Sequence, residues 1–258
     1  MMTLVRVVAA AAAAVLMAGC ASSPAPPAVA ADPSVLRVGV SANSPPMVFK
    51  QGQDVVGVEA DLAAALGREL GRRVVFIETD REKLIDALCD NRIDIIMSAM
   101  SVTPARSYRV GFTMPYLRVG QMALARGNEK NKYLLGRTLQ PGNGVGVKPG
   151  TTAEIFVREE FPNVKCKYYP SGEEGADGLL KEQIDMFISD APMIWYLAGM
   201  YETKGLAVVP TTFTQEELAW GLRRSDTQLL AAANAFLQKA QANGELTRTF
   251  GKWMPGFQ

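Results

Sequence analysis

The sequence predicts an α/β fold in two lobes, each a mostly parallel sheet flanked by helices. Segments with strand and helix patterning alternate from residue 35 onward, which is typical of doubly wound sheets. The alternation runs through one series and then a second, so the chain has enough elements for two lobes. A hydrophobic content of 48% with 21% charged residues is that of an ordinary globular chain.

The first series covers residues 35–97. Strand composition is found at 35–40, 74–77 and 93–97. A helix is predicted over 58–70, where leucines recur at helical spacing before Gly71 ends it, and a shorter helix over 81–89.

The second series covers residues 119–188 and is followed by a return segment. Strands are predicted at 119–125, 144–147, 164–168 and 184–188, with helices at 152–160, 173–181 and from 190 to past 197. Strands at 206–209 and 218–222, an amphipathic helix over 226–243 and a short helix near Leu246 follow. We expect the long helix to pack back on the first lobe.

Charge and residue content exclude several classes of function. Lys and Arg number 27 against 26 Asp and Glu, without a basic cluster, which argues against nucleic-acid binding. The chain has no His, and Cys20, Cys89 and Cys166 are too scattered to hold a metal. No His-based catalysis, metal or cofactor is therefore expected, and Cys89 and Cys166 are expected to be buried free thiols.

Residues 1–19 have the pattern of a secretory signal peptide. Arg6 precedes an apolar run at 7–17, and this run would rise only roughly 16 Å as a helix, too little for a bilayer core of about 30 Å. Small residues then lead into Cys20, which resembles the acylated cysteine of bacterial lipoproteins, and residues 20–34 predict a Pro/Ala-rich linker. We expect a protein of the periplasm or cell surface, anchored to a membrane through Cys20.

A cationic side chain follows the first lobe's third strand. Thr103 and Pro104 suit the start of a helix, which puts Arg106 in its first turn. At the end of a strand in an open α/β sheet, the Arg106 guanidinium can bind a carboxylate. The alternative is a surface arginine paired with an acid.

Two strand ends of the second lobe carry complementary polar groups. Thr151 and Glu154 predict a capped helix, whose N-terminal N–H groups favour an anion. Asp190 either caps the following helix or offers a carboxylate to an ammonium group. We call these groups the zwitterion clamp. Arg106 and the helix start at Thr151 would hold an anion on one side, and Asp190 would hold an ammonium group on the other.

The order of short motifs resembles family 3 of the bacterial solute-binding proteins, which serve amino-acid uptake. The matching segments span residues 35–253: Pro45-Pro46, Gly57-Val-Glu-Ala-Asp61-Leu, Leu84-Ile-Asp-Ala-Leu88, Ile93-Asp94, Ser101-Val-Thr-Pro-Ala-Arg106, Gly111-Phe-Thr-Met-Pro-Tyr116, Val147-Lys-Pro-Gly-Thr151-Thr, Ile184-Asp, Ser189-Asp190, Asn243-Gly-Glu-Leu246 and Trp253.

The resemblance implies a type II periplasmic-binding-protein fold whose two lobes, joined by two crossover hinge strands, close on a ligand. Lobe 1 would comprise 35–118 plus 217–258, and lobe 2 residues 119–216. Arg106 matches the arginine that holds the α-carboxylate, and Asp190 the aspartate that holds the α-amine. Positions that match further ligand contacts are Ser101, Thr151, Thr152, Lys148 and, through its backbone, Ala99.

Two positions depart from the family pattern. Ser44 and Arg81 stand where the family commonly has aromatic residues that sandwich the ligand side chain. We hypothesise that Arg81 faces the ligand and selects an acidic or otherwise anionic one. The alternative is a solvated arginine at a helix start.

The leading function is therefore a monomeric, non-enzymatic binding protein that captures an amino-acid-like solute for an ABC permease. One alternative is an enzyme like cyclohexadienyl dehydratase, a member of this fold, with Glu173 or Glu174 as candidate acids for proton transfer. Another is a sensor module that presents the same ligand to a membrane receptor.

Overall fold

The computed structural model describes residues 32–133 and 142–255. The predicted signal peptide, Cys20 and the linker up to residue 31 lie outside the described residues. Within them, no helix is long and apolar enough to span a bilayer.

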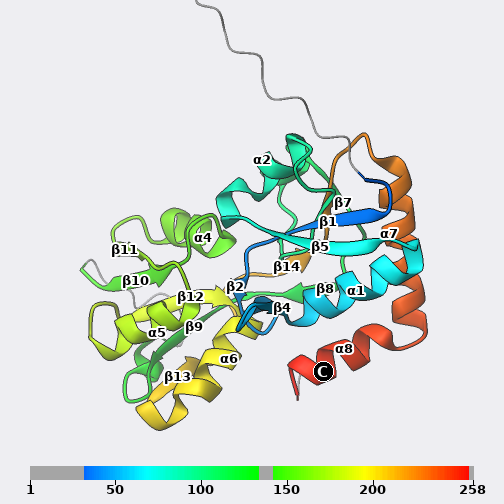
Figure 1. Cartoon of the computed structure of the whole chain (residues 1–258). Coiled ribbons are helices and arrows are strands. Elements are labelled where there is room, and N and C mark those ends of the chain that lie inside the picture. Colours follow the sequence, from blue (N-terminus) through cyan, green and yellow to red (C-terminus); the bar gives the residue numbers. More distant parts are fainter. Residues whose placement is uncertain (1–31, 134–141, 256–258) are drawn as a thin grey trace, which may run out of the picture. The chain divides into compact units, whose positions relative to one another are not determined.

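Lobe 1 contains a five-stranded sheet in the order β5-β1-β6-β15-β7, in which Figure 1 shows β1 and β5 side by side. Its strands are β1 (Val35–Val40), β5 (Arg73–Glu78), β6 (Ile95–Ile96), β7 (Gly111–Phe112) and β15 (Gly221–Leu222). β15 pairs antiparallel with both β6 and β7, and the other pairings are parallel. Four strands thus share one direction and β15 runs against them.

Lobe 2 repeats this arrangement in the order β11-β10-β12-β9-β13. Its strands are β9 (Gln121–Arg126), β10 (Gly144–Val147), β11 (Lys165–Tyr168), β12 (Met186–Asp190) and β13 (Leu206–Val209). Here β9 is the reversed strand, again fourth in the order. The two sheets therefore have the same topology, although the sequence shows no internal repeat.

Two short strands connect the lobes. β8 (Leu117–Val119) pairs antiparallel with β14 (Glu216–Leu218), and each leads directly into a reversed strand, β8 into β9 and β14 into β15. Because these strands enter each sheet from the crossover, they run against the remaining strands. The predicted lobe boundaries, 118/119 and 216/217, fall within this pair.

Helices cover the two five-stranded sheets. A small three-stranded sheet is separate from both of them. Lobe 1 has α1 (Val58–Leu70), α2 (Leu84–Cys89), α3 (Pro104–Arg109), α7 (Thr227–Ala242) and α8 (Glu245–Trp253). Lobe 2 has α4 (Thr152–Glu160), α5 (Gly172–Leu180) and α6 (Ala191–Tyr201). The small sheet consists of β2 (Asn43–Ser44), β3 (Val48–Gln51) and β4 (Asp54–Val56), and 3-10 turns occur at Arg81–Lys83, Lys130–Tyr133 and Glu202–Lys204.

The apolar faces predicted for α1 and α7 form the core of lobe 1. Leu62 and Leu66 of α1 pack in one buried cluster with Phe236 and Leu237 of α7. Burial at this spacing is the main stabilisation of such helices. The expected thiols are free, but Cys89 is exposed and Cys166 half-buried, because Cys89 is the last residue of α2 and Cys166 lies on strand β11.

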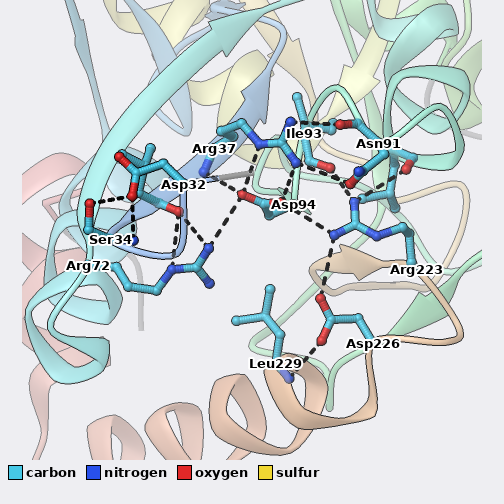
Figure 2. Close-up of polar contacts among 12 residues, drawn as sticks. Asp32, Ser34, Arg37, Arg72, Asn91, Ile93, Asp94, Arg223, Asp226 and Leu229 are labelled. Carbon is cyan, nitrogen blue, oxygen red and sulfur yellow. Dashed lines mark hydrogen bonds and ion pairs between the residues drawn. The ribbon is translucent and has the colours of Figure 1, made fainter. Parts of the chain in front are cut away.

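An aspartate anchors the central strand of each lobe. Asp94, just before β6, accepts hydrogen bonds from the backbone N–H (2.9 Å) and Nη2 (2.7 Å) of Arg37, and it pairs with Arg223 at 3.3 Å (Figure 2). Asp185, just before β12, accepts from the Gly144 N–H at 2.8 Å and from Arg126 Nη2 at 3.0 Å. Both anchors lie where the strands begin, which leaves the opposite sheet edges to the polar residues of the site.

Candidate functional site

One cavity between the lobes is lined by all eight residues that the sequence suggested for ligand contact. They are Arg81, Ala99, Ser101 and Arg106 of lobe 1 and Lys148, Thr151, Thr152 and Asp190 of lobe 2. We call it the closed cavity, because its volume is about 20 Å³, on a scale where one water needs roughly 10–15 Å³. The lobes must therefore part to admit a larger ligand.

Arg106 projects from the first turn of α3, as predicted. Thr103 caps this helix by accepting a hydrogen bond from the Arg106 N–H at 3.2 Å. The guanidinium donates to the Ser101 carbonyl at 2.8 Å and, across the lobes, to the Gly150 carbonyl at 3.0 Å. Burial and the neighbouring Arg81 lower the pKa of Arg106 to about 10, so it stays cationic at neutral pH.

Asp190 lies at the end of β12, and its side chain does not cap α6. The carboxylate instead accepts from Gln121 Nε2 at 2.6 Å, because Asp190 and Gln121 are register partners in the β12–β9 ladder. The sequence left two roles open for Asp190, and side-chain capping is not the one that the structure shows: Asp190 stands at the start of α6, but its carboxylate is oriented towards the crossover. Burial and the nearby Glu216 raise the pKa of Asp190.

A polar network at the crossover, which the sequence did not predict, supports this carboxylate. Gln121 Nε2 also donates to Thr152 Oγ1 at 3.1 Å and to Glu216 Oε1 at 3.0 Å. Thr152 in turn donates to Glu216 Oε2 at 2.6 Å and lies 3.4 Å from Ser101 Oγ. Glu216 is the first residue of the crossover strand β14, and Gln121 begins β9, just after the crossover strand β8. Only knowledge of how these strands pair would have assigned the two residues to the site.

Thr151 caps α4 as expected, and its hydroxyl is committed to the protein. Its Oγ1 accepts from the Glu154 N–H at 3.3 Å and donates to the Lys148 carbonyl at 2.7 Å. Glu154 completes the cap by accepting from the Gly150 N–H at 2.9 Å. Thr151 therefore shapes the start of the helix that lines the cavity.

Lys148 connects the lobes. The residue is 4% exposed, and its ammonium group donates to the carbonyl and Oδ1 of Asn43 at 2.8 and 2.7 Å and to Ser44 Oγ at 2.8 Å. Burial, with Arg81 nearby, lowers the pKa of Lys148 to about 7. All three ammonium hydrogens have protein acceptors, so Lys148 acts first as a contact between the lobes.

The backbone N–H of Ala99 is held by a buried acid. It donates to Glu59 Oε1 at 2.7 Å, and Ala99 has a left-handed φ of 48°. Tyr116 and Trp220 donate to the same carboxylate at 2.6 and 2.8 Å. Burial raises the pKa of Glu59, while these donors act in the opposite direction. The Gly57-Val-Glu59 motif marked this position, but nothing in the sequence indicated its partners.

Arg81 begins the 3-10 turn before α2 and lines the closed cavity. Its Nη2 donates to the Ser98 carbonyl at 3.0 Å, whereas its buried Nε has no hydrogen-bond partner among the described residues. Arg81 and Lys148 also line a wider hollow of about 760 Å³, which we call the outer hollow. These two cations are thus shared between the closed cavity and its surroundings.

Comparison with known proteins accounts for this geometry. The model of the bacterial extracellular solute-binding proteins, family 3, matches residues 36–256. The chain belongs to this family. Its fold, as predicted, is that of the type II periplasmic amino-acid-binding proteins: a lysine-complexed structure from Wolinella succinogenes is 29% identical with a TM-score of 0.80, over 86% of this chain and 96% of the other.

Two relatives of this family-3 chain are informative. ABC transporter arginine-binding protein 1 of Escherichia coli is 27% identical over 85% of the chain and 90% of its own length. Cyclohexadienyl dehydratase of Pseudomonas aeruginosa is 28% identical over 61% of the chain and 59% of its own length. The family's relatives are thus mainly extracellular or periplasmic binding proteins, with an enzyme among them.

Proposed function

We propose that this chain is the solute-binding component of an ABC importer and that it captures an amino acid, or a similar small zwitterion, between its lobes. One observation carries the proposal: Arg106 of lobe 1 and Asp190 of lobe 2 line the same cavity. The Arg106 guanidinium would hold the α-carboxylate and the Asp190 carboxylate the α-ammonium group. A guest held at both ends joins the two lobes.

The contacts between the lobes give this capture a structural basis. Arg106 to Gly150, Lys148 to Asn43 and Ser101 to Thr152 each cross from one lobe to the other. Closure therefore buries the ligand's charged groups among fixed dipoles. Two buried charge contacts can support micromolar binding, which corresponds to about −8 kcal/mol. The protein would act as a monomer and deliver its ligand to a membrane permease.

Substitution of the zwitterion clamp tests the proposal. We expect Arg106→Ala or Asp190→Ala to weaken amino-acid binding by roughly 30-fold or more in titration calorimetry, since each leaves a buried charge of the ligand unpaired. The matched control is Arg109→Ala, an exposed arginine of the same helix that pairs with Asp86, and it should bind as the wild type does. Wild-type affinity in both clamp variants would refute the proposal.

Membrane attachment through Cys20 is a further part of the proposal. It is supported by the signal-like segment at 1–19 and the Pro/Ala-rich segment that follows it. Mass spectrometry of the protein recovered from the membrane fraction should find an acylated Cys20, and Cys20→Ala should move the protein to the soluble fraction. An unmodified Cys20 in the wild type would exclude the anchor.

The alternative is a dehydratase, favoured by the relative that bears that name. Glu173 is the second residue of α5, is half-buried and lies near enough to Lys148 to influence its pKa, whereas Glu174 is exposed. Glu173 is thus the better of the two candidate acids. Turnover of prephenate or arogenate by the purified protein would establish the enzyme, and ligand binding without turnover supports the binding protein. A ligand-presenting sensor would share the clamp and would be separated from an importer component by its membrane partner.

A further inference from the structure

We propose that the ligand carries a negatively charged side chain and that Arg81 is the residue that selects it. The inference rests on the proposed function, because it assumes that Arg106 and Asp190 hold the two ends of a zwitterion. It concerns the side chain of the ligand and the part of the closed cavity that Arg106 and Asp190 do not line.

The charges that line the closed cavity do not balance. Among the lining residues Arg81 and Arg106 are cationic, Lys148, whose pKa is about 7, is partly so, and Asp190 is anionic. The main-chain groups of an amino acid are together neutral, so a bound zwitterion leaves the excess of positive charge unchanged. An anionic side chain reduces it, whereas a cationic side chain adds to it.

The acids nearest to the closed cavity are already bound to protein donors. Behind its wall, Glu59 accepts from Ala99, Tyr116 and Trp220. At the crossover, Glu216 accepts from Gln121, Thr152 and Thr214. The charges of Glu59 and Glu216 reduce the positive potential of the closed cavity, but their oxygens already accept hydrogen bonds from these donors.

The acids of the outer hollow are placed in a similar way. Glu78 pairs with Lys50 at 2.7 Å and Asp80 with Lys83 at 2.6 Å, and Glu82 is exposed. None of these acids lines the closed cavity. The carboxylate that lines the closed cavity is that of Asp190, which the ligand's α-ammonium group would occupy, so a cationic side chain would find no second carboxylate among the lining residues.

Arg81 is the cation with donor capacity left for the ligand side chain. Lys148 gives its three hydrogens to Asn43 and Ser44, and the remaining N–H groups of Arg106 are assigned to the α-carboxylate. Arg81 donates through Nη2 to backbone carbonyls, and its buried Nε has no acceptor in the part of the chain that the structure describes. An unsatisfied buried donor is costly, and the planar edge of a guanidinium fits a carboxylate.

Glutamate and glutamine provide the sharpest test, because they have nearly the same shape and differ in side-chain charge. Calorimetry with the purified protein should show that glutamate binds at least about tenfold more tightly than glutamine, or that aspartate binds more tightly than asparagine. Arginine and lysine should bind more weakly than both acids. Arg81→Gln should bring the acid and its amide within about threefold of each other. Arg81→Lys should keep a preference for the acid.

The matched control is Lys83→Gln, which removes a positive charge two residues away in the same turn. Lys83 is exposed, pairs with Asp80 and does not line the closed cavity, so the preference should persist. If Arg81→Gln fails to fold, the wild-type ratio of acid to amide decides alone.

The outcomes separate this inference from the proposed function. Tighter binding of neutral or cationic amino acids than of the acids by the wild type overturns the inference and leaves the proposed function standing. An acid preference that survives Arg81→Gln overturns the role of Arg81. Absence of binding for every amino acid tested, whatever its charge, overturns both proposals.

Discussion

Glu59 holds one wall of the closed cavity in place from behind. Its carboxylate is fully buried and accepts from the Ala99 N–H, which fixes the left-handed backbone at that residue. Tyr116 and Trp220 are the other donors. An acceptor-only group suits three donors, so the carboxylate form matches the site.

Replacement of Glu59 by glutamine should therefore destabilise the protein. The new amide NH₂ would face existing donors, and one buried donor would lose its acceptor, at a cost of about 1–3 kcal/mol in the free energy of unfolding. Urea unfolding measures this cost. Glu69→Gln, an exposed residue of the same helix that pairs with Lys239, should change it by less than about 1 kcal/mol. Equal effects of the two substitutions would contradict this account of Glu59.

At the scale of single residues, position along the chain predicted the candidate site better than it predicted side-chain partners. Arg106 and Asp190 could be found because each follows a strand end, and the sheet brings such ends to one edge. The partners of Asp190 could not, because they depend on strand register: Gln121 is opposite Asp190 in β9. The role of Glu59 could not be predicted either, because its hydrogen-bond donors come from distant segments of the chain.

At the scale of elements, the aspartates that precede β6 and β12 connect strands that the sequence separates widely. Asp94 is 4% exposed at its side chain and is surrounded by Arg37, Arg72 and Arg223 (Figure 2). Burial raises the pKa of Asp94, but the hydrogen bonds from Arg37 and Arg223 and the charge of Arg37 together outweigh burial and hold the pKa below its ordinary value of 3.8. Ionised Asp94 therefore stabilises the fold.

The lowered pKa of Asp94 predicts how stability depends on pH. A depressed pKa in the folded state gives stability that is present above the unfolded pKa and is lost as the pH falls through the folded pKa. Asp94→Asn should lower the free energy of unfolding by about 3 kcal/mol at pH 7, because three arginines lose their carboxylate. The difference from the wild type should shrink as the pH falls below 3.8.

The control for Asp94 is Asp90→Asn. Asp90 pairs with Arg92, but its side chain is 62% exposed, so this change should cost less than about 1 kcal/mol at either pH. A difference between Asp94→Asn and the wild type that is the same at pH 7 and at pH 3 would show that the charge of Asp94 contributes nothing.

Hydrophobic periodicity predicted the longer elements and missed the short ones. The predicted bounds of α1 and β1 agree with the structure, since each buries a regular apolar face. β2, β3 and β4 have between two and four residues each, too few for a periodic pattern. The crossover strands β8 and β14 were implied only by the family resemblance, because their pairing depends on how the chain returns from lobe 2.

At the scale of the whole described chain, the two lobes present polar groups of opposite sign to the closed cavity. Lobe 1 contributes Arg106 and lobe 2 contributes Asp190, and the closed cavity is lined by both. A dipolar ligand with its carboxylate at Arg106 and its ammonium group at Asp190 satisfies both lobes at once. Its binding therefore favours the arrangement in which the lobes are in contact.

The most direct test is a thermodynamic cycle on the α-ammonium group. The affinity of the best amino-acid ligand and of the same acid without its α-amino group is measured by calorimetry on the wild type and on Asp190→Ala. We predict that the wild type loses roughly 30-fold or more on removal of the amino group and that Asp190→Ala loses little, since the contact is already absent. Equal losses in both proteins would place the ammonium group away from Asp190 and contradict the account.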